Sequence, residues 1–387
     1  MPDFFSLLIK PASGDCNLRC HHCFYLPKRY LFGPDPHRMS LKTLETLTRK
    51  FLSIPMPSHA FAWQGGEPTL MGLDFFKEAV ALQKRYARKG TIITNALQTN
   101  GTLLDDGWGS FLKKNKFLVG ISIDGPAEVH DTYRWCGEGR GSHADVMRGL
   151  DVLKRHNVEF NVLTLLTQAN ADKPEEIYRY LKSLDLRFHQ YIECAEWDEE
   201  GNPLPFALKK GEYSTFLCRL FDEWYKEDVR TISIRLFDSI ISRLVTGRPT
   251  MCPMDGHCSG YFVIECDGSV FPCDFHVQED LRLGNIVSDD FLVLRKRKIY
   301  QAFASAKDPR QSGTAPIALA FPEKQPLGNA TLQYGCASCR FLPLCMGDCP
   351  KNRRDSKSFF CADWKRFYTY TIDRFERLAG EVIRQKK

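Results

Sequence analysis

Apolar residues in the first half of the chain follow two patterns that alternate along the sequence. Short apolar runs, typical of buried strands, are separated by longer segments in which apolar residues recur every three or four positions, as on one face of a helix. The strand-like runs are residues 6–9, 60–63, 92–97, 117–123, 160–165 and 189–192. After the first run, Ser40 is placed to cap a helix with Leu44 and Leu47 on its apolar face. Six strand-helix units in a row predict a parallel sheet with right-handed crossovers.

Six units are too few to close an eight-stranded barrel, so the pattern favours an α/β fold with an open, partial (β/α)6 barrel. The active site of such a fold lies at the carboxyl ends of the strands. The loop that follows residues 6–9 is therefore expected at the active site.

The second part of the chain has a different composition. A polar stretch with proline and glycine, residues 196–205, ends the alternation. Beyond two amphipathic helices, short strands, turns and cysteines replace the earlier pattern. We predict a barrel domain with a connecting helix over residues 1–235 and a small cysteine-rich domain over residues 236–387. Residues 305–335 have no clear period and are expected to form a long surface loop, and the chain is expected to end in a helix from Trp364 to about Arg384.

Charge and hydropathy exclude some classes of partner. The chain has 387 residues, with 53 Lys and Arg against 47 Asp and Glu, and its net charge of +6 gives no argument for a nucleic-acid partner. Its apolar start is too short for a signal peptide, and no apolar run approaches the roughly 18 residues that cross a bilayer. We therefore expect a cytoplasmic protein with neither a membrane nor a nucleic acid as partner.

Fifteen cysteines in a reducing compartment indicate metal binding rather than disulfides. Their grouping agrees, because three lie near the start, four within residues 252–273 and five within residues 336–361. Four cysteines fall outside the paired spacings and are interpreted as ordinary small buried residues: Cys136, Cys194, Cys218 and Cys266.

Cys16, Cys20 and Cys23 form a CxxxCxxC pattern directly after the first strand-like run. Three thiolates in one short loop can bind three irons of a four-iron cluster and leave the fourth iron open to a substrate. The alternative is a zinc site in which His21 or His22 supplies the fourth ligand.

Eight more cysteines provide the number of thiolates that two fully ligated four-iron clusters need. They are Cys252, Cys258, Cys273, Cys336, Cys339, Cys345, Cys349 and Cys361. Two structural zinc sites with four cysteines each are the alternative.

Polar residues follow several of the predicted strands. Gln64, Gly65, Gly66 and Glu67 come after the second strand, where paired glycines let a ligand approach the backbone and Glu67 is an acceptor beside it. A plain turn is the alternative. Four further residues are expected at the barrel mouth, facing cofactor or substrate unless they merely cap strand ends: Gln98, Asn100, Ser122 and Asp124.

These motifs together resemble the radical S-adenosylmethionine (SAM) enzymes, and the later cysteines resemble the SPASM extension of peptide-modifying maturases. Over almost the whole chain the sequence is similar to the anaerobic sulfatase-maturating enzymes. The segments that carry the resemblance are residues 10–13, Cys23-Phe24-Tyr25, and residues 63–69, 97–101, 119–126 and 272–274.

The resemblance implies three 4Fe-4S clusters and SAM as cofactors. SAM would bind the open iron held by Cys16, Cys20 and Cys23, and the implied cofactor-binding residues are Tyr25, Gln64, Gly65, Gly66, Glu67, Ser122 and Asp124. Gln98 and Asn100 are the implied substrate contacts. One auxiliary cluster would take Cys252, Cys258, Cys273 and Cys349, and the other Cys336, Cys339, Cys345 and Cys361.

The resemblance also implies an activity: oxidation of a Cys or Ser side chain of a sulfatase polypeptide to formylglycine, with Asp274 as general base and a flavodoxin or ferredoxin-type protein as reductant. A radical derived from SAM would remove a hydrogen from Cβ of the target residue. One alternative is another SPASM maturase that forms thioether or carbon-carbon crosslinks, which the fifteen residues before Cys16 disfavour because they leave no room for a leader-binding domain. An alternative of another class is a zinc-ribbon scaffold.

Overall fold

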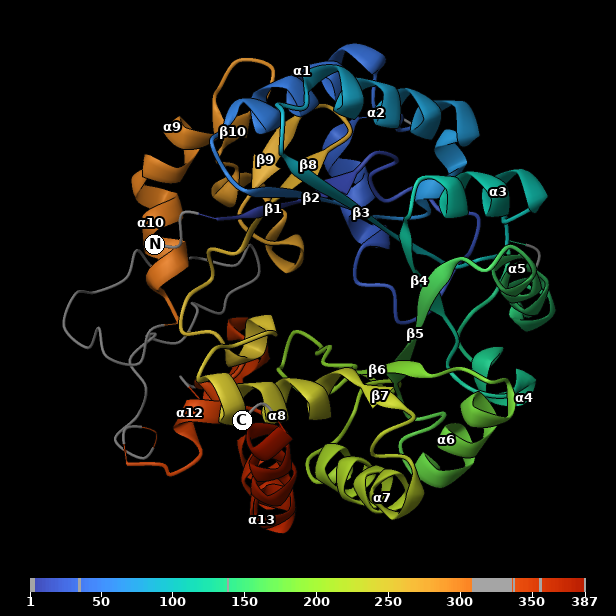
Figure 1. The fold of residues 1–387 in the computed structure, drawn as a ribbon, viewed down its shortest axis with the longest axis vertical. Coiled ribbons are helices and arrows are strands. Elements are labelled where there is room, and N and C mark those ends of the chain that lie inside the picture. The colour runs from blue at the N-terminus through green and yellow to red at the C-terminus, as the bar shows by residue number, and fades with distance from the viewer. Residues whose placement is uncertain are drawn as a thin grey trace. The chain divides into compact units, whose positions relative to one another are not determined.

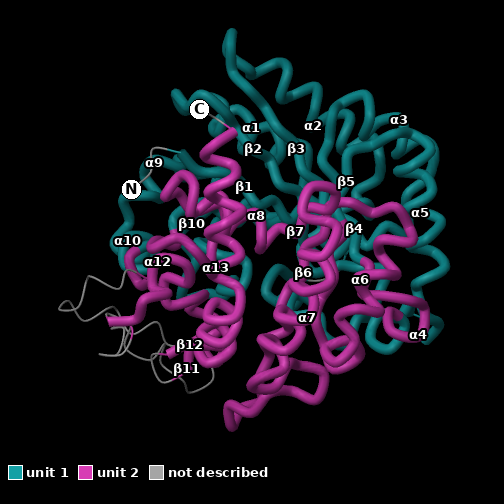
Figure 2. The backbone as a smooth tube through the Cα atoms, turned by 60° about the horizontal axis from the view of Figure 1, so that its bottom comes forward, with its two compact units in different colours: residues 1–122, 131–161, 259–304 teal, residues 123–130, 162–258, 305–387 magenta. Residues whose placement is uncertain are grey.

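The computed structural model describes residues 4–33, 36–137, 139–307, 336, 338–354 and 357–385. These residues form two compact units, shown in two colours in Figure 2. The first unit combines residues 1–122, 131–161 and 259–304, and the second combines residues 123–130, 162–258 and 305–387. Each unit is therefore built from separate stretches of the chain.

The sheet of the first unit has the strand order β10-β9-β8-β1-β2-β3-β4. Its strands are β1 (Ser6–Lys10), β2 (Ser58–Trp63), β3 (Ile92–Thr99), β4 (Leu118–Ser122), β8 (Tyr261–Glu265), β9 (Ser269–Phe271) and β10 (Gly284–Asn285). Strand β1 pairs in parallel with both β2 and β8, so Leu7 lies opposite Phe61 on one side and Phe262 on the other. Strands β2 to β4 continue the parallel sheet, whereas β9 and β10 pair antiparallel at its far edge.

Helices α1 and α2 pack beside each other over the first strands of this sheet (Figure 1). The helices of the unit are α1 (Leu41–Ser53), α2 (Leu73–Tyr86), α3 (Asp106–Lys114), α5 (His143–Arg155), α9 (Phe291–Lys296) and α10 (Lys298–Ser305). Short 3₁₀ turns are η1 (Leu26–Phe32), η2 (Pro68–Met71), η4 (Asp274–His276) and η5 (Glu279–Leu281). As predicted, the Ser40 hydroxyl caps α1 by accepting from the backbone N–H of Thr43 at 3.1 Å.

Aromatic side chains from both ends of the sequence fill the core of the first unit. The ring of Phe5 lies 5.2 Å from that of Phe262 and 5.7 Å from that of Phe291, and Phe51 lies 5.2 Å from Phe61. All five side chains are buried. Burial of these aromatic side chains stabilises the pairing of β1 with β8.

The second unit contains the parallel strands β5 (Glu159–Leu166), β6 (Phe188–Glu193) and β7 (Ser233–Ile234). The first three residues of β5 belong to the first unit. The helices are α4 (Ala127–His130), α6 (Pro174–Ser183), α7 (Glu212–Glu227), α8 (Arg235–Thr246), α12 (Leu342–Cys345) and α13 (Cys361–Gln385), with the turns η3 (Cys252–Met254) and η6 (Pro350–Asn352) and a hairpin of β11 (Arg353–Arg354) and β12 (Lys357–Ser358). Helix α13 packs against α7 and α8 through Phe221, Phe237 and Phe375.

The six predicted strand-helix units are confirmed in position. The strand-like runs correspond to β1 to β6, and the last helix begins at Cys361, slightly earlier than expected. Most of the predicted surface loop, residues 308–335, lies outside the described residues. The domain boundary at residue 235 stays a prediction, and the pairing of β8 with β1 brings residues from beyond that boundary into the first unit. No helix in the described part of the chain is long and apolar enough to cross a membrane.

Candidate active site

The loop with Cys16, Cys20 and Cys23 begins just after β1 and is held by a neighbouring segment of the first unit. The backbone N–H of Arg19 donates to the Trp135 carbonyl at 2.7 Å, and that of His21 donates to the Tyr133 carbonyl at 3.0 Å. The loop is therefore fixed at the carboxyl end of β1, where the sequence predicted it.

Cys20 and Cys23 are close enough to Cys16 to influence the pKa of its thiol. Burial, followed by the nearby Glu67 carboxylate, raises the pKa of Cys16 to about 12, and Cys20 and Cys23 contribute in the same direction. Such a thiol is protonated at neutral pH unless a metal replaces the proton. Three thiols in one short loop are the number of protein ligands that a four-iron cluster with one open iron takes. In the described part of the chain, no group of three or more His, Cys, Asp or Glu is arranged to hold a single metal ion.

Gly65 and Gly66 pack against the backbone that leads into the cysteine loop. A Cβ on Gly66 would lie 1.9 Å from the carbonyl oxygen of Asp15, and Gly65 has a φ of +138°. The N–H of Gly66 also donates to the Ser13 carbonyl at 2.7 Å. The paired glycines thus have a packing role that the sequence reasoning did not foresee, since that reasoning attributed them to close approach of a ligand.

Glu67 is fully buried and holds two strand ends together. Its Oε1 accepts from the N–H and hydroxyl of Thr69 at 3.0 and 2.7 Å and from the hydroxyl of Thr99 at 2.8 Å, while Oε2 accepts from the N–H of Asn100 at 2.7 Å. Burial raises the pKa of Glu67, although these donors oppose the rise. The carboxylate therefore joins the turn after β2 to the end of β3.

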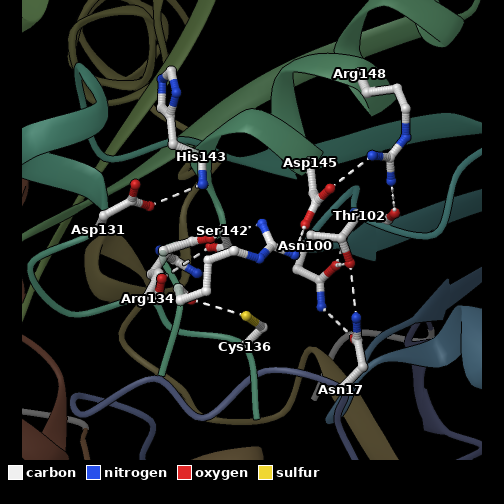
Figure 3. A network of polar contacts seen from close by, with 12 residues as sticks. Asn17, Asn100, Thr102, Asp131, Arg134, Cys136, Ser142, His143, Asp145 and Arg148 are labelled. Carbon is white, nitrogen blue, oxygen red and sulfur yellow. Dashed lines mark hydrogen bonds and ion pairs between the residues drawn. The ribbon is translucent and has the colours of Figure 1, made fainter. Parts of the chain in front are cut away.

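Other polar residues predicted at the strand ends are largely buried. Asn100 contacts the cysteine loop, with its Nδ2 2.9 Å from Oδ1 of Asn17 (Figure 3). The same Nδ2 lies 3.7 Å from Sγ of Cys16. In the second unit, Asp124 accepts from the N–H of Leu165 through Oδ1 at 2.9 Å. Gln64 follows β2 and Ser122 ends β4, as the sequence predicted, whereas Gln98 lies within β3, which extends two residues beyond the predicted strand.

Asp274 lies in a buried, charged pocket of the first unit, directly after Cys273. Its Oδ2 is 3.8 Å from Nζ of Lys10, its Oδ1 accepts from the Tyr261 hydroxyl at 3.2 Å, and Lys28 donates to its backbone carbonyl. Burial acts to raise the pKa of Asp274, but the charges of Lys10 and Lys28 outweigh it and hold the pKa below its ordinary value. Asp274 is therefore ionised, as a proton acceptor must be.

Tyr25 is buried in the same region, and Cys23 packs against the apolar cluster to which it belongs. Its hydroxyl donates to Glu265, and Nζ of Lys10 lies 4.1 Å from its ring centre. Burial raises the pKa of Glu265 to about 7. Among the described residues, Lys10 Nζ has no hydrogen-bond partner. It lies near two buried carboxylates, those of Asp274 and Glu265.

Three cysteines assigned to the first auxiliary cluster come together in the second unit. Burial raises the pKa of Cys349, and the nearby Asp348, Cys258 and Cys252 act in the same direction. Lys307 donates to the carbonyls of Cys252 and Pro253, at 2.7 Å each. Cys273 belongs to the first unit.

The four cysteines assigned to the second auxiliary cluster line one cavity in the second unit. They are Cys336, Cys339, Cys345 and Cys361. The cavity wall also includes apolar side chains and two lysines, Lys357 and Lys365. Four thiols around one cavity fit a four-iron cluster.

Comparison with known proteins identifies the family. The model of the radical SAM superfamily matches residues 11–181, and that of an iron-sulfur cluster-binding domain, SPASM, matches residues 252–314. The cysteine-type anaerobic sulfatase-maturating enzyme of Clostridium novyi is 35% identical over 97% of this chain and 97% of its own. The chain belongs to the anaerobic sulfatase-maturating enzymes.

Further relatives of this family include both of its types. The serine-type anaerobic sulfatase-maturating enzyme of Bacteroides thetaiotaomicron is 33% identical over 98% of this chain and 92% of its own. The solved structure of native anSMEcpe with bound AdoMet and the Cp18Cys peptide superposes with a TM-score of 0.86, at 35% identity, and covers 98% of this chain and 99% of that chain.

Family membership confirms the predicted α/β fold class, a radical SAM domain followed by an iron-sulfur cluster-binding domain. It also confirms the enzyme class and the classes of cofactor, SAM and iron-sulfur clusters. The zinc-ribbon scaffold is thereby excluded. The individual roles of the predicted site residues stay predictions.

Sequence reasoning missed several residues that shape the site. Lys10 continues the apolar run of β1 and is buried beside Asp274, and its charge at a strand end was a signal for function. Asn17 and Thr102 contact Asn100, and nothing in their spacing indicated this.

Proposed function

We propose that this enzyme oxidises a Cys or Ser side chain of a sulfatase polypeptide to formylglycine. The observation that carries the proposal is the similarity to sulfatase-maturating enzymes along nearly the whole chain, with the three-cysteine loop placed directly after β1. Both cysteine-type and serine-type relatives match, so the proposal includes both target residues.

Three cysteine sets would hold three 4Fe-4S clusters. Cys16, Cys20 and Cys23 would leave one iron open for SAM, and the two auxiliary sets would ligate their clusters fully. SAM at the reduced cluster would supply a radical that abstracts a hydrogen atom, a step that the protein side chains themselves cannot perform. The predicted neighbours of SAM are Tyr25, Gln64, Gly65, Gly66, Glu67, Ser122 and Asp124. The buried network of Glu67 supports a positioning role for that residue within this set.

Asp274 is the proposed general base of the reaction. Its Oδ atoms would accept the proton of the substrate thiol or hydroxyl, which makes the substrate carbon easier to oxidise. Lys10 and Lys28 keep the carboxylate ionised, and the Tyr261 hydroxyl fixes one oxygen, leaving Oδ2 as the proposed acceptor. Gln98 is the proposed contact to the peptide, so it would orient the target side chain.

The overall change is balanced. A target cysteine would lose one hydrogen from Cβ to the radical derived from SAM, one proton to Asp274 and one electron to an auxiliary cluster. Water would then replace sulfur to give the aldehyde and hydrogen sulfide. A target serine loses the same hydrogen, proton and electron and needs no water. A flavodoxin or ferredoxin-type protein is the proposed source of the activating electron, and a reducing cytoplasm suits so many free thiols.

The test is an anaerobic incubation of the reconstituted enzyme with SAM, a reductant and two peptides that differ only in having Cys or Ser at the target position. We expect mass spectrometry to find an aldehyde that reacts with a hydrazine on at least one peptide. Peptides with alanine at the target position are the matched control and should not change. A crosslinked peptide without an aldehyde would contradict the proposal and favour a crosslink-forming maturase.

A further inference from the structure

Three polar side chains next to the cysteine loop form a closed ring of hydrogen bonds in the first unit. Asn17 donates from Nδ2 to the Thr102 hydroxyl at 2.8 Å, and that hydroxyl donates to Oδ1 of Asn100 at 2.7 Å. Asn100 completes the ring by donating from Nδ2 to Oδ1 of Asn17 at 2.9 Å. Figure 3 shows these residues together, with Asn17 projecting from the cysteine loop toward Asn100.

The direction of this ring is fixed by the backbone. The backbone N–H of Thr102 donates to Oδ1 of Asn100 at 3.0 Å, and an amide nitrogen could not accept that bond. Oδ1 of Asn100 must therefore face Thr102, so Nδ2 must face the cysteine loop.

One N–H of Asn100 is left after the ring is complete. The amide nitrogen has two hydrogens, and only one is donated to Asn17. The second lies toward Sγ of Cys16, which is 3.7 Å from Nδ2. The backbone N–H of Leu18 is another donor to the same sulfur, at 3.3 Å.

The ring is anchored on both sides to the sheet and to a helix. The backbone N–H of Asn100 donates to the buried carboxylate of Glu67 at 2.7 Å. The carbonyl of Thr102 accepts from Nη2 of Arg148, on α5, at 2.8 Å, and Arg148 is paired with Asp145 at 2.6 Å. The side chain of Asn100 is thus held in one orientation, and its buried position leaves little freedom to turn toward another ligand.

We propose that Asn100 is a positioning residue for the cluster, because its side-chain N–H donates to the thiolate of Cys16 while Asn17 and Thr102 hold that donor in place. This assignment rests on the proposed function, in which Cys16 binds iron. A hydrogen bond to a cluster sulfur stabilises the more negative, reduced form and raises the reduction potential. Asn100 therefore makes the first electron easier to accept, and it replaces the substrate contact expected for this residue from the sequence.

The test is a reductive titration of the anaerobic holoenzyme followed by electron paramagnetic resonance, with and without SAM. The part of the signal that SAM changes belongs to the cluster with the open iron. Asn100→Asp keeps the acceptor for Thr102 but removes the N–H and adds a negative charge. Thr102→Val, which adds no charge, is therefore measured beside it. For Asn100→Asp we expect the ratio of reduced to oxidised cluster at a fixed potential to fall about tenfold, equal to a midpoint lower by about 59 mV for one electron.

The matched control is Asn115→Asp, because the amide of Asn115 bonds only the carbonyl of Phe111 at the end of α3 among the contacts of the described residues. That variant should keep the parental midpoint. A parental midpoint in Asn100→Asp with full iron content would overturn the proposal. If Asn100→Asp binds less iron, Thr102→Val decides, since it removes the hydroxyl that holds the donor. A smaller shift in the same direction supports the proposal, and an unchanged midpoint overturns it.

Failure of this assignment can be told apart from failure of the proposed function. If the parental enzyme has no SAM-dependent signal, Cys16 is not part of a SAM-binding cluster and both proposals fall. If that signal is present and only the Asn100 midpoint is unchanged, the enzyme activity stands and Asn100 has no effect on the cluster.

Discussion

Replacing Glu67 with alanine tests whether this carboxylate holds the active-site end of the sheet together. Four donors converge on it, from Thr69, Thr99 and Asn100, at 2.7 to 3.0 Å. All three partners are buried, so water cannot readily take the place of the carboxylate.

The expected loss of stability follows from those four donors. An unpaired buried donor costs about 1 kcal/mol at the low end, so four give roughly 4 kcal/mol. Removal of a carboxylate whose own burial is unfavourable offsets part of this. We therefore expect Glu67→Ala to lower the free energy of unfolding by about 3 kcal/mol. Glu67→Gln should lose about 1–2 kcal/mol, because its Nε2 would face the N–H of Asn100.

The measurement is urea denaturation of the anaerobic holoenzyme, followed by tryptophan fluorescence. Glu78→Ala is the matched control, since Glu78 is an exposed residue of α2, and its effect should stay within about 0.5 kcal/mol. If Glu67→Ala is as stable as Glu78→Ala, the four donors find other partners and the reasoning is refuted.

Three further predictions concern the clusters, the base and the pH dependence of stability. Replacing Cys16, Cys20 and Cys23 together by alanine should leave about eight of about twelve irons and abolish SAM cleavage; full iron in that variant would refute the ligand assignment. Asp274→Asn should keep its iron and still cleave SAM, but form formylglycine at least about 100-fold more slowly; a parental rate would place the base elsewhere. Burial, then a neighbouring carboxylate, raises the pKa of Glu193 to about 7, so its contribution to stability is present at low pH and is lost as the pH rises through about 7. Glu193→Gln should remove that loss, worth about 3 kcal/mol, and a variant whose melting temperature falls as much as the parent's between pH 5 and 8 would contradict this.

The sequence predicted those parts of the fold that depend on local periodicity. The strands β1 to β6 and the capped start of α1 at Ser40 follow from patterns within a few residues of each other. The pairing of β8 with β1 joins residues more than 250 positions apart, for example Leu7 and Phe262. No local pattern encodes such a contact.

The features of the candidate site likewise divide into those that a local sequence pattern predicts and those that it does not. The cysteine loop was predictable because its three thiols lie within eight residues of sequence and directly follow a strand. The roles of Gly66 and Glu67 were not, because the groups they contact, at Asp15, Thr99 and Asn100, meet them only in the folded sheet. Buried Lys10 likewise pairs with Asp274 across most of the sequence.

The central claim is that hydrogen leaves Cβ of the target residue in a reaction that consumes SAM. It can be tested directly with a peptide deuterated at that carbon, incubated anaerobically with the enzyme, SAM and a reductant. The account predicts one deuterium in the deoxyadenosine formed from SAM, in an amount that matches the formylglycine peptide. Formylglycine made together with deoxyadenosine that carries no deuterium would contradict it.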